Sequence, residues 1–394
     1  MRPVAIVGLL ALLAAAPAWA GDRVDVSGHV KAFGVGTIPY DSRLMPPDPT
    51  GSAVFDSRVK LMLSPFDGLR FDLHPTLTAT VGGATGLDTG VGRGAPEAFP
   101  MTAMVVDGAS FGLRFRMDRL SARAEIGPVR FTLGRQPISF GQGQAFTPMD
   151  LVAPFTPATL DTSYKPGVDA LRADVFVGMG GQITVLAAYL GAWTLDGTAI
   201  VAHAQATVGA VDLQALVGSI YGDAVVGLSI WAPIGPVGVY GDVTVTGVRP
   251  RPFVRAVVGG FARPGPTTTV SVEVYGQRFG VNGKDDYLLF SAGERFQRGE
   301  LWLSGHLYAS VAVIQELTPL LTLNVAVLGN LLDPSFFLLP SVAWNVASNA
   351  DLSFGVQVGL GKRPDEDADN PFASARSEFG TAPFSGFLNL GVYF

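Results

Sequence analysis

The side chains that most often carry catalysis or bind metals are few in this sequence and lie far apart. None of the 394 residues is cysteine, which excludes thiolate metal sites, thiol nucleophiles and disulfides. The four histidines stand singly in separate segments, so no His-x-x-x-His pair can form; they are His29, His74, His203 and His306. We therefore expect no enzyme, no cofactor and no metal site. The remaining catalytic alternative is an enzyme that gathers His and Ser from adjacent strands.

Arginine and lysine show the one pattern with a chemical meaning. In the first half of the chain they recur at alternate positions of segments whose other positions are apolar, so they share one face. Eight basic residues share that face with only four acidic ones, namely Lys31, Arg58, Lys60, Arg70, Arg119, Arg123, Arg130 and Arg172 against Asp25, Asp72, Glu125 and Asp174. Such an excess attracts anions. The alternative is that the charges pair with one another and only stabilise the wall that carries them.

The second half of the chain carries the opposite charge on the corresponding face. Arg255 stands there against four acidic residues, Asp212, Asp242, Glu273 and Asp351. If the two halves face each other, a basic wall opposes an acidic one, and the field between them orients dipolar solutes.

The elements that position these charges are strands of alternating hydrophobicity. Leu352, Phe354 and Val356, for example, alternate with Ser353 and Gly355. The alternating segments are about 9 to 12 residues long, which suits a tilted strand that crosses a bilayer better than the shorter strands of a soluble sandwich. Tight turns also alternate with long links, at 34–53, 82–108, 137–166, 279–301 and 362–385. We therefore predict an all-β fold, a transmembrane antiparallel up-and-down β-barrel.

The composition agrees with a membrane barrel. Hydrophobic residues make up 48% of the chain and charged residues only 15%. After residue 20 no stretch of about 18 residues is free of polar side chains, which excludes a helical bundle. The turns predict 18 strands, with 16 as the lower bound, and a barrel of that size has room for water. Two points stay open: an extra hairpin at Tyr287 to Arg298, and a bulge or break near Met117, where the alternation reverses.

The longest proline-rich segment, 137–166, mixes polar and apolar residues. A loop with this many apolar side chains would not stay solvated, so we expect it to fold into the lumen and constrict it. Its polar residues, the candidate constriction residues, are Gln142, Gln144, Asp150, Asp161 and Lys165. The alternative is a surface loop that packs on its neighbours or makes oligomer contacts.

The two ends of the chain indicate export to a membrane. Residues 1–20 combine a basic start, an apolar core and Ala18-Trp19-Ala20, which predicts a cleaved Sec signal peptide followed by one barrel domain, 21–394. The last strand carries Leu388, Leu390, Val392 and the terminal Phe394 on one face, and it resembles the β-signal that the barrel-assembly machinery of Gram-negative bacteria recognises. We expect an outer-membrane location, with lipid and lipopolysaccharide as partners. The net charge of −6 gives no support to nucleic-acid binding.

A family resemblance centres on the long loop. GRQPISFGQGQAFTPMD (134–150), KPGVDALR (165–172) and ELTPLLTL (316–323) resemble the proteobacterial alginate-export and porin-like outer-membrane barrels, with Phe140 where tryptophan is more usual. Arg135 and Arg172 fall within the matching motif. The resemblance implies a barrel whose arginine-rich lumen attracts an acidic polysaccharide.

These observations predict a porin for passive diffusion of small hydrophilic solutes, preferentially anions, with Arg135 and Asp174 added to the pore-lining residues. Two alternatives remain: an export channel for an acidic polysaccharide, and a structural or adhesive barrel with a plugged lumen. Conductance in a planar bilayer separates them, because a plugged barrel gives no current steps and the polymer should block an exporter.

Overall fold

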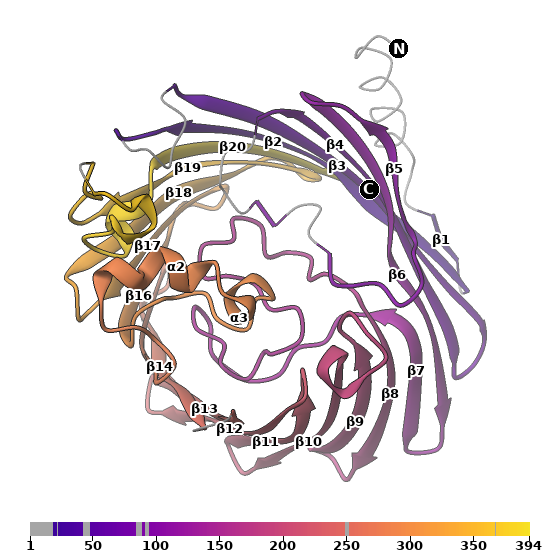
Figure 1. The fold of residues 1–394 in the computed structure, drawn as a ribbon. Coiled ribbons are helices and arrows are strands. Elements are labelled where there is room, and N and C mark those ends of the chain that lie inside the picture. Colours follow the sequence, from indigo (N-terminus) through magenta and orange to yellow (C-terminus); the bar gives the residue numbers. More distant parts are fainter. Residues whose placement is uncertain are drawn as a thin grey trace.

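A computed structural model describes residues 19–21, 23–41, 48–83, 89–90, 94–248, 252–366 and 368–394. Eighteen strands close into one barrel (Figure 1). They are β2 (Val24–Ile38), β3 (Thr50–Phe66), β4 (Leu69–Gly82), β6 (Phe111–Ile126), β7 (Val129–Gln136), β8 (Val168–Val177), β9 (Gly181–Tyr189), β10 (Thr198–Val208), β11 (Val211–Ile220), β12 (Asp223–Ile234), β13 (Val237–Gly247), β14 (Phe253–Gly265), β15 (Thr268–Gln277), β16 (Leu307–Thr318), β17 (Leu321–Asn330), β18 (Ser335–Ala347), β19 (Ala350–Leu360) and β20 (Phe384–Tyr393). Two shorter strands, β1 (Trp19–Gly21) and β5 (Thr102–Asp107), pair with β2 and β6.

All neighbouring strands are antiparallel, and the last strand pairs with the first long one. The β20–β2 register runs from His29 opposite Tyr393 to Ile38 opposite Phe384. Closure satisfies the backbone hydrogen bonds of both strands, which is what allows a sheet to span a bilayer. The predicted all-β, antiparallel barrel of 18 strands is confirmed.

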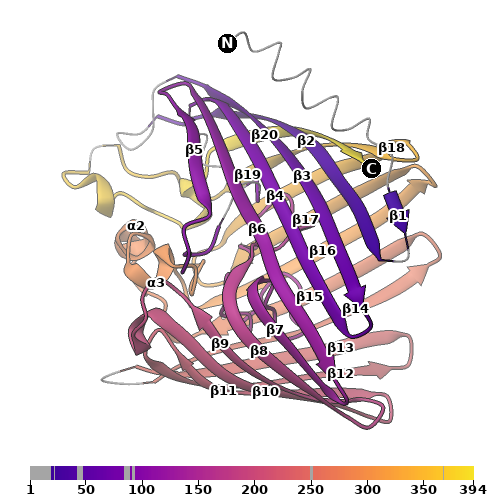
Figure 2. The ribbon, with the colours of Figure 1, turned by 90° about the vertical axis from the view of Figure 1, so that its right-hand side faces the viewer.

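Short turns gather at one end of the barrel and long connections at the other (Figure 2). The long connections are 39–49, 83–110, 137–167, 278–306 and 361–383, close to the predicted links. The barrel strands range from 8 residues in β7 to 17 in β3, so the wall is taller along β2, β3, β4 and β6 than predicted. Residues 1–18 of the predicted signal peptide lie outside the described residues, and cleavage stays a prediction.

The extra hairpin that the sequence left open at Tyr287 to Arg298 does not form. This segment forms two short helices, α2 (Tyr287–Ser291) and α3 (Glu294–Gln297), separated by Ala292 and Gly293. Phe290 holds them together, since its ring lies 6.1 Å from that of Phe279 and 6.3 Å from that of Phe296. Within the described part of the chain, no helix has the length and apolar character needed to cross a membrane.

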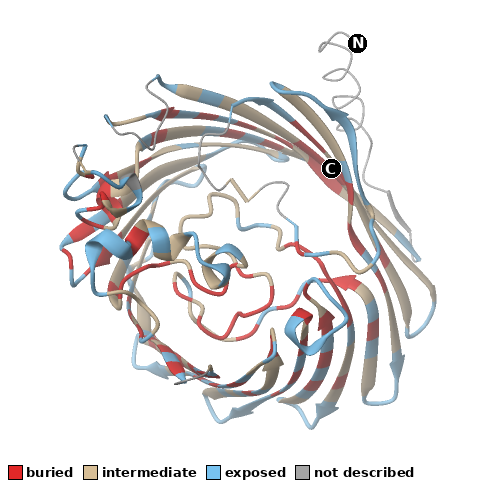
Figure 3. Cartoon of the chain, in the orientation of Figure 1, coloured by how far each residue is buried: buried red, intermediate tan, exposed pale blue. Residues whose placement is uncertain are grey.

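Side chains alternate between the lumen and the outer face of the barrel, as the sequence predicts. On β13, Tyr240, Asp242 and Thr244 are buried, whereas Val243 and Val245 face outward. The burial comes from a loop inside the barrel, which Figure 3 shows as a mainly buried segment bordered by strands with buried stripes. The polar positions therefore line the lumen, and the apolar positions face lipid.

The predicted break of alternation on β6 is a bulge at Asp118. His74 of β4 pairs with Arg119, but the next residue, Pro75, pairs with Met117. Proline lacks the N–H that a regular ladder needs, which accounts for the irregularity at this position. The extra residue lets Arg116 and Arg119 both point into the lumen on either side of Asp118, all three buried.

Barrel closure depends on a glycine that faces the C-terminal aromatic ring. The N–H of Gly28 donates to the carbonyl of Phe394 at 2.7 Å, and a Cβ on Gly28 would lie 2.5 Å from Cζ of Phe394 and 2.3 Å from the carbonyl oxygen of Arg58. Leu388 and Leu390 face outward on the same strand, so the predicted assembly residues form one apolar face. Their recognition by the assembly machinery stays a prediction.

Gly28→Ala is expected to destabilise the barrel by about 1–3 kcal/mol, because the added methyl group meets backbone that cannot give way. The unfolding temperature, read from heat-modified mobility on gels, measures the effect. Gly34→Ala on the same strand is the control, since a Cβ there has no atom within 4 Å. Equal stability of both variants would contradict the packing of Phe394 on Gly28.

Candidate functional site: the barrel lumen

The connection between β7 and β8 lies inside the barrel (Figure 1). This segment, 137–167, is called the constriction loop below. It contacts the wall on several sides: the Phe140 ring lies 4.7 Å from that of His203 on β10, Gln357 on β19 donates to the carbonyl of Ala158 at 3.2 Å, and Lys31 on β2 binds Asp161. The predicted inward fold is confirmed, and the surface-loop alternative is wrong.

Apolar packing explains why the first half of the constriction loop leaves the solvent. Phe146, Met149 and Val152 have no exposed surface, and Ile138 has 1%. The ring of Phe146 stacks on that of Tyr275 of β15 with 4.8 Å between centroids. Burying such side chains stabilises by about 1.5–3 kcal/mol each, so this half of the loop has a core of its own inside the lumen.

Two acids of the wall bind the backbone of the same half. The carboxylate of Asp242 accepts the N–H groups of Gln142 and Gly143 at 2.9 Å each, and Glu273 accepts those of Gln144, Ala145 and Phe146 at 2.7–3.0 Å. These acids were expected to form an acidic wall facing the solute. That expectation is wrong for both, because their charge is used to satisfy buried amides of the loop.

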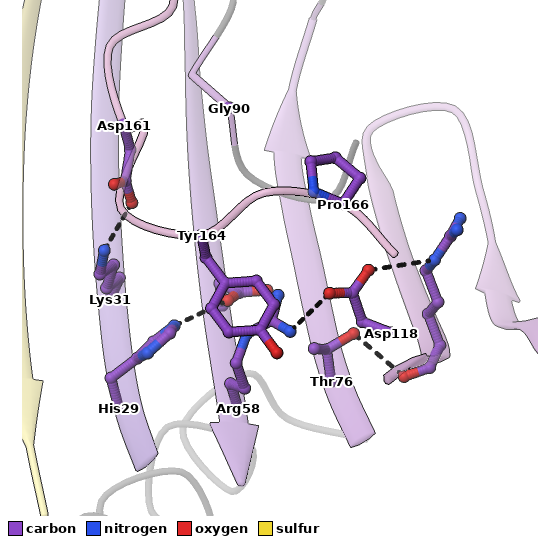
Figure 4. A pocket seen from close by; sticks show the side chains of 11 residues that line it. His29, Lys31, Arg58, Thr76, Gly90, Asp118, Asp161, Tyr164 and Pro166 are labelled. Carbon is purple, nitrogen blue, oxygen red and sulfur yellow. Dashed lines mark hydrogen bonds and ion pairs between the residues drawn. The ribbon is translucent and has the colours of Figure 1, made fainter. Parts of the chain in front are cut away.

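The second half of the constriction loop binds the basic wall instead (Figure 4). Residues 161–166 are called the arm below. Lys31 donates to Asp161 at 2.5 Å and to Ser163 at 2.7 Å. Burial favours the neutral form of Asp161, but the ammonium of Lys31 and the hydrogen bonds from Ser163 outweigh it and lower the pKa of Asp161. The arm thus places a carboxylate against the wall.

Tyr164 of the arm covers the arginines of the wall. The guanidinium carbon of Arg58 lies 3.5 Å from the centroid of the Tyr164 ring, that of Arg119 lies 4.6 Å away, and the ammonium of Lys60 lies 5.6 Å away. Burial raises the pKa of Tyr164, so its hydroxyl is protonated at neutral pH, and it shares a hydrogen bond with Nδ1 of His74. The ring is a cation–π partner for two guanidinium groups at once.

Asp118, the bulge residue, is the carboxylate that these arginines share. Its Oδ2 lies 2.8 Å from Arg58 and 3.1 Å from Arg119, and its Oδ1 lies 3.6 Å from Arg116. Arg116 also lies 3.4 Å from Glu97. With Lys31 and Lys60 included, five cationic side chains at this level meet four carboxylates, Asp56, Glu97, Asp118 and Asp161, which leaves a small excess of positive charge.

The other predicted basic residues lie below the arm, toward the short turns. Arg70 of β4 stands directly opposite Arg123 of β6, and Arg172 of β8 lies two strands further along, on the far side of Thr132 of β7. Arg70 and Arg172 keep 39% and 27% of their side-chain surface exposed while pairing with Asp72 and Asp174. Arg123 has no ion pair among the described residues. Arg130, also half-buried, pairs with Glu125 at 2.7 Å.

Arg135 does not line the pore, contrary to the prediction. In the strand register it stands opposite Leu120 and Asp169, on the outward side of the wall. It is 1% exposed, and it binds Asp169 at 2.8 Å and Glu97 at 2.9 Å. The family resemblance had placed Arg135 in the pore; strand alternation does not, because on β7 it shares the face of Phe131 and Leu133, which are 43% and 62% exposed on the outer side.

The predicted constriction residues divide into two groups. Asp150 and Lys165 form an ion pair at 2.5 Å within the loop, and Asp161 is bound to Lys31, so none of these charges is free. Gln144 is exposed and Gln142 is half-buried, so these two amides face the open lumen. The loop narrows the pore mainly through its bulk and its amides.

Sequence reasoning missed several residues of the site. Arg116, Asp118 and Tyr164 were not assigned, nor was Asp56, which binds His29 at 3.2 Å. Arg116 was detectable, because it alternates with Phe115 and Met117. Tyr164 was not, because only the path of the loop brings it to the arginines.

The described residues show no cluster typical of metal binding. No group of three or more His, Asp or Glu side chains there is arranged to hold a metal ion. Each histidine has its own neighbour in a different place: Asp56 for His29, Tyr164 for His74, Gln214 for His203 and a backbone carbonyl for His306.

A closed barrel with a loop folded into a charged lumen is the architecture of outer-membrane porins, and solved structures share this fold. Acinetobacter baumannii OccAB1 superposes with a TM-score of 0.57 at 12% identity, covering 97% of this chain and 99% of its own. Pseudomonas aeruginosa OccK2 (OpdF) gives 0.58 at 8% identity, covering 94% and 97%. Acinetobacter baumannii OccAB2 gives 0.56 at 10% identity, covering 95% and 98%.

No protein-family model matches the sequence, and no curated protein matches it. The structural likeness therefore shows the fold, and the resemblance to alginate-export barrels stays a prediction.

Proposed function

We propose that this chain is an outer-membrane porin through which small hydrophilic solutes diffuse passively, with a preference for anions. The fold supports a porin, since the barrels that share it are outer-membrane porins. The anion preference rests on the lumen wall, where basic side chains of β2, β3, β4, β6 and β8 exceed the carboxylates near them.

One observation carries the preference for anions. Arg70 and Arg123 stand directly opposite each other on neighbouring strands, and Arg172 lies at the same level. Like charges directly opposite in a sheet are destabilising, so stability alone does not account for this row. The row is accessible from the lumen, and weak partly exposed pairs such as Arg70–Asp72 leave it able to bind a passing anion.

The test replaces the three arginines of this row together. The triple variant Arg70→Gln, Arg123→Gln, Arg172→Gln is expected to lower the anion-to-cation permeability ratio about threefold or more, because three charges leave the wall of a narrow pore. The reversal potential in a salt gradient across a planar bilayer measures this ratio. The shift should grow as ionic strength falls, since screening acts over about 10 Å at 0.1 M salt.

The matched control keeps the charge. The triple lysine variant at the same positions should retain the anion preference, since the field of the row is preserved while guanidinium geometry is lost. If the glutamine variant keeps the wild-type ratio at low salt, the row is structural. A wild-type barrel that gives no current steps would favour the plugged structural barrel.

Export of an acidic polysaccharide receives no added support from the lumen. The constriction loop crosses it and is fixed to the wall by Asp242 and Glu273, so a polymer would have to pass a bound obstacle. Block of the current by alginate at low concentration would instead favour the exporter.

A further inference from the structure

We infer that Asp161 and Tyr164 are internal ligands of the basic wall and determine ion selectivity by competing with solute anions for Lys31, Arg58 and Arg119. This inference rests on the proposed function, because it concerns the selectivity of the same pore. It assigns a role in specificity to two residues of the arm: Asp161 provides a carboxylate, and Tyr164 provides the face of an aromatic ring.

The first step is that the arm occupies the cations. Lys31 is 3% exposed, Arg58 8% and Arg119 5%, and the arm residues close over them. Lys31 is bound by Asp161 and Ser163, and both arginines stack on Tyr164. Figure 4 shows Lys31 against Asp161, and Arg58 beside the Tyr164 ring. A solute in the lumen therefore meets these cations only if the arm moves aside.

The second step is that the wall is incompletely neutralised beneath the arm. Arg58 and Arg119 share Asp118 with Arg116; Asp56 lies near Arg58 and Glu97 near Arg116, but Lys60 has no ion pair among the described residues. To the two arginines the arm adds only neutral groups, the Tyr164 ring and the carbonyl of Lys165, which accepts from Arg119. A cation–π contact contributes roughly 0.5–2 kcal/mol, whereas hydrogen bonds between ionised partners are about twice as strong as neutral ones. An anion is thus a better partner for the arginines than the ring that covers them.

The third step is that the arm is held differently from the rest of the loop. The first half is fixed by buried apolar side chains and by backbone bonds to Asp242 and Glu273. The arm contacts the wall mainly through polar and charged side chains, and its Thr162 and Ser163 are exposed. Competing anions weaken such contacts and leave the apolar half in place, so the arm is the part that solutes displace.

Asp161→Asn and Tyr164→Leu test the inference separately. Asp161→Asn leaves Lys31 without its counter-charge, and Tyr164→Leu keeps apolar bulk but removes the π-face. Each is expected to raise the anion-to-cation permeability ratio at least about twofold. Each should also lower the chloride concentration at which single-channel conductance half-saturates, because the exposed cations then bind chloride.

Conservative variants are the matched controls. Tyr164→Phe keeps the ring and loses only the hydrogen bond to His74, and Asp161→Glu keeps the charge, so both should behave as wild type. Lys31→Met combined with Asp161→Asn should return the ratio toward that of wild type, because the freed cation is gone. Heat-modified gel mobility verifies that each variant is a folded barrel.

The outcomes separate this inference from the proposed function. Wild type could prefer anions while Asp161→Asn and Tyr164→Leu leave both the permeability ratio and the half-saturating chloride concentration unchanged. The arm would then only occupy space in the lumen, and the inference is overturned. If Tyr164→Phe changes the ratio as much as Tyr164→Leu, the π-face is not the determinant and the inference is also overturned. A wild-type channel without anion preference, unaffected by loss of the arginine row, overturns the proposed function instead.

Discussion

Arginine in place of Val243 is expected to destabilise the barrel by about 2–4 kcal/mol, the depth-dependent cost of a cation at mid-bilayer on a lipid-facing strand position. Val243 lies mid-strand on β13 and pairs in register with Leu228 of β12, whose side chain is 55% exposed on the outer face. Denaturant unfolding of the barrel folded into lipid vesicles measures the loss.

Gln205→Arg is the matched control. Gln205 is exposed on the lumen face of β10, where its amide bonds only weakly to Gln182 at 3.5 Å, so an arginine there reaches water. A similar loss at both positions would show that the two faces of the barrel are assigned wrongly.

Thr244 and Gln357 also face the lumen by strand alternation, but we do not expect either position to tolerate arginine. Thr244 is fully buried beneath the constriction loop, and its hydroxyl donates to the carbonyl of Pro148 at 3.3 Å. Gln357 is 2% exposed and donates to Ala158 of the loop. Facing the lumen is equivalent to facing water only where the loop leaves the wall free.

The double variant Asp242→Ala, Glu273→Ala should release the first half of the constriction loop from the wall. It leaves five backbone N–H groups of residues 142–146 without acceptors, and each bond to a charged group contributes about 1.5–3 kcal/mol. We expect single-channel conductance to rise and the current to flicker, because the loop then moves in the pore. Limited proteolysis within residues 142–160 should increase in parallel.

Ser229→Ala is the control for this variant. Ser229 pairs in register with Asp242 on the same wall, is 4% exposed, and its hydroxyl has no hydrogen-bond partner. Its conductance should match that of wild type. If the double variant keeps the wild-type conductance and its current does not flicker, apolar packing alone fixes the loop.

The pore therefore combines two kinds of wall with different tasks. The acids of β13 and β15 hold the loop through its backbone, and the basic residues of β2, β3 and β6 hold its arm through side chains. Among the described basic residues of the wall, the row of Arg70, Arg123 and Arg172 lies clear of both. Under the proposed function, selectivity then depends on which cations the loop leaves uncovered and not simply on how many the wall carries.

The sequence by itself determined the barrel and its faces. A period of two places successive side chains on opposite sides of a strand, and a bilayer accepts only apolar ones on the outside, so Val243 and Asp242 could be assigned from their positions alone. Turn residues fixed the strand order, because neighbours along the chain pair as hairpins. The reversal near Met117 likewise predicted the bulge, since an inserted residue shifts the alternation.

Only the tertiary structure decided how the charges are used. Strand alternation says that a residue faces the lumen but not what lies opposite it there, and the constriction loop follows no periodic pattern. Its path brings Asp161 to Lys31 and Tyr164 to Arg58, contacts that span more than 100 residues of sequence. Arg135 shows a similar limit: the family resemblance placed it in the pore, but its contacts with Asp169 and Glu97, which lie 34 and 38 residues away in the chain, bury it in the wall. Long-range pairing depends on where a non-repeating segment lies in space, and local sequence does not encode that position.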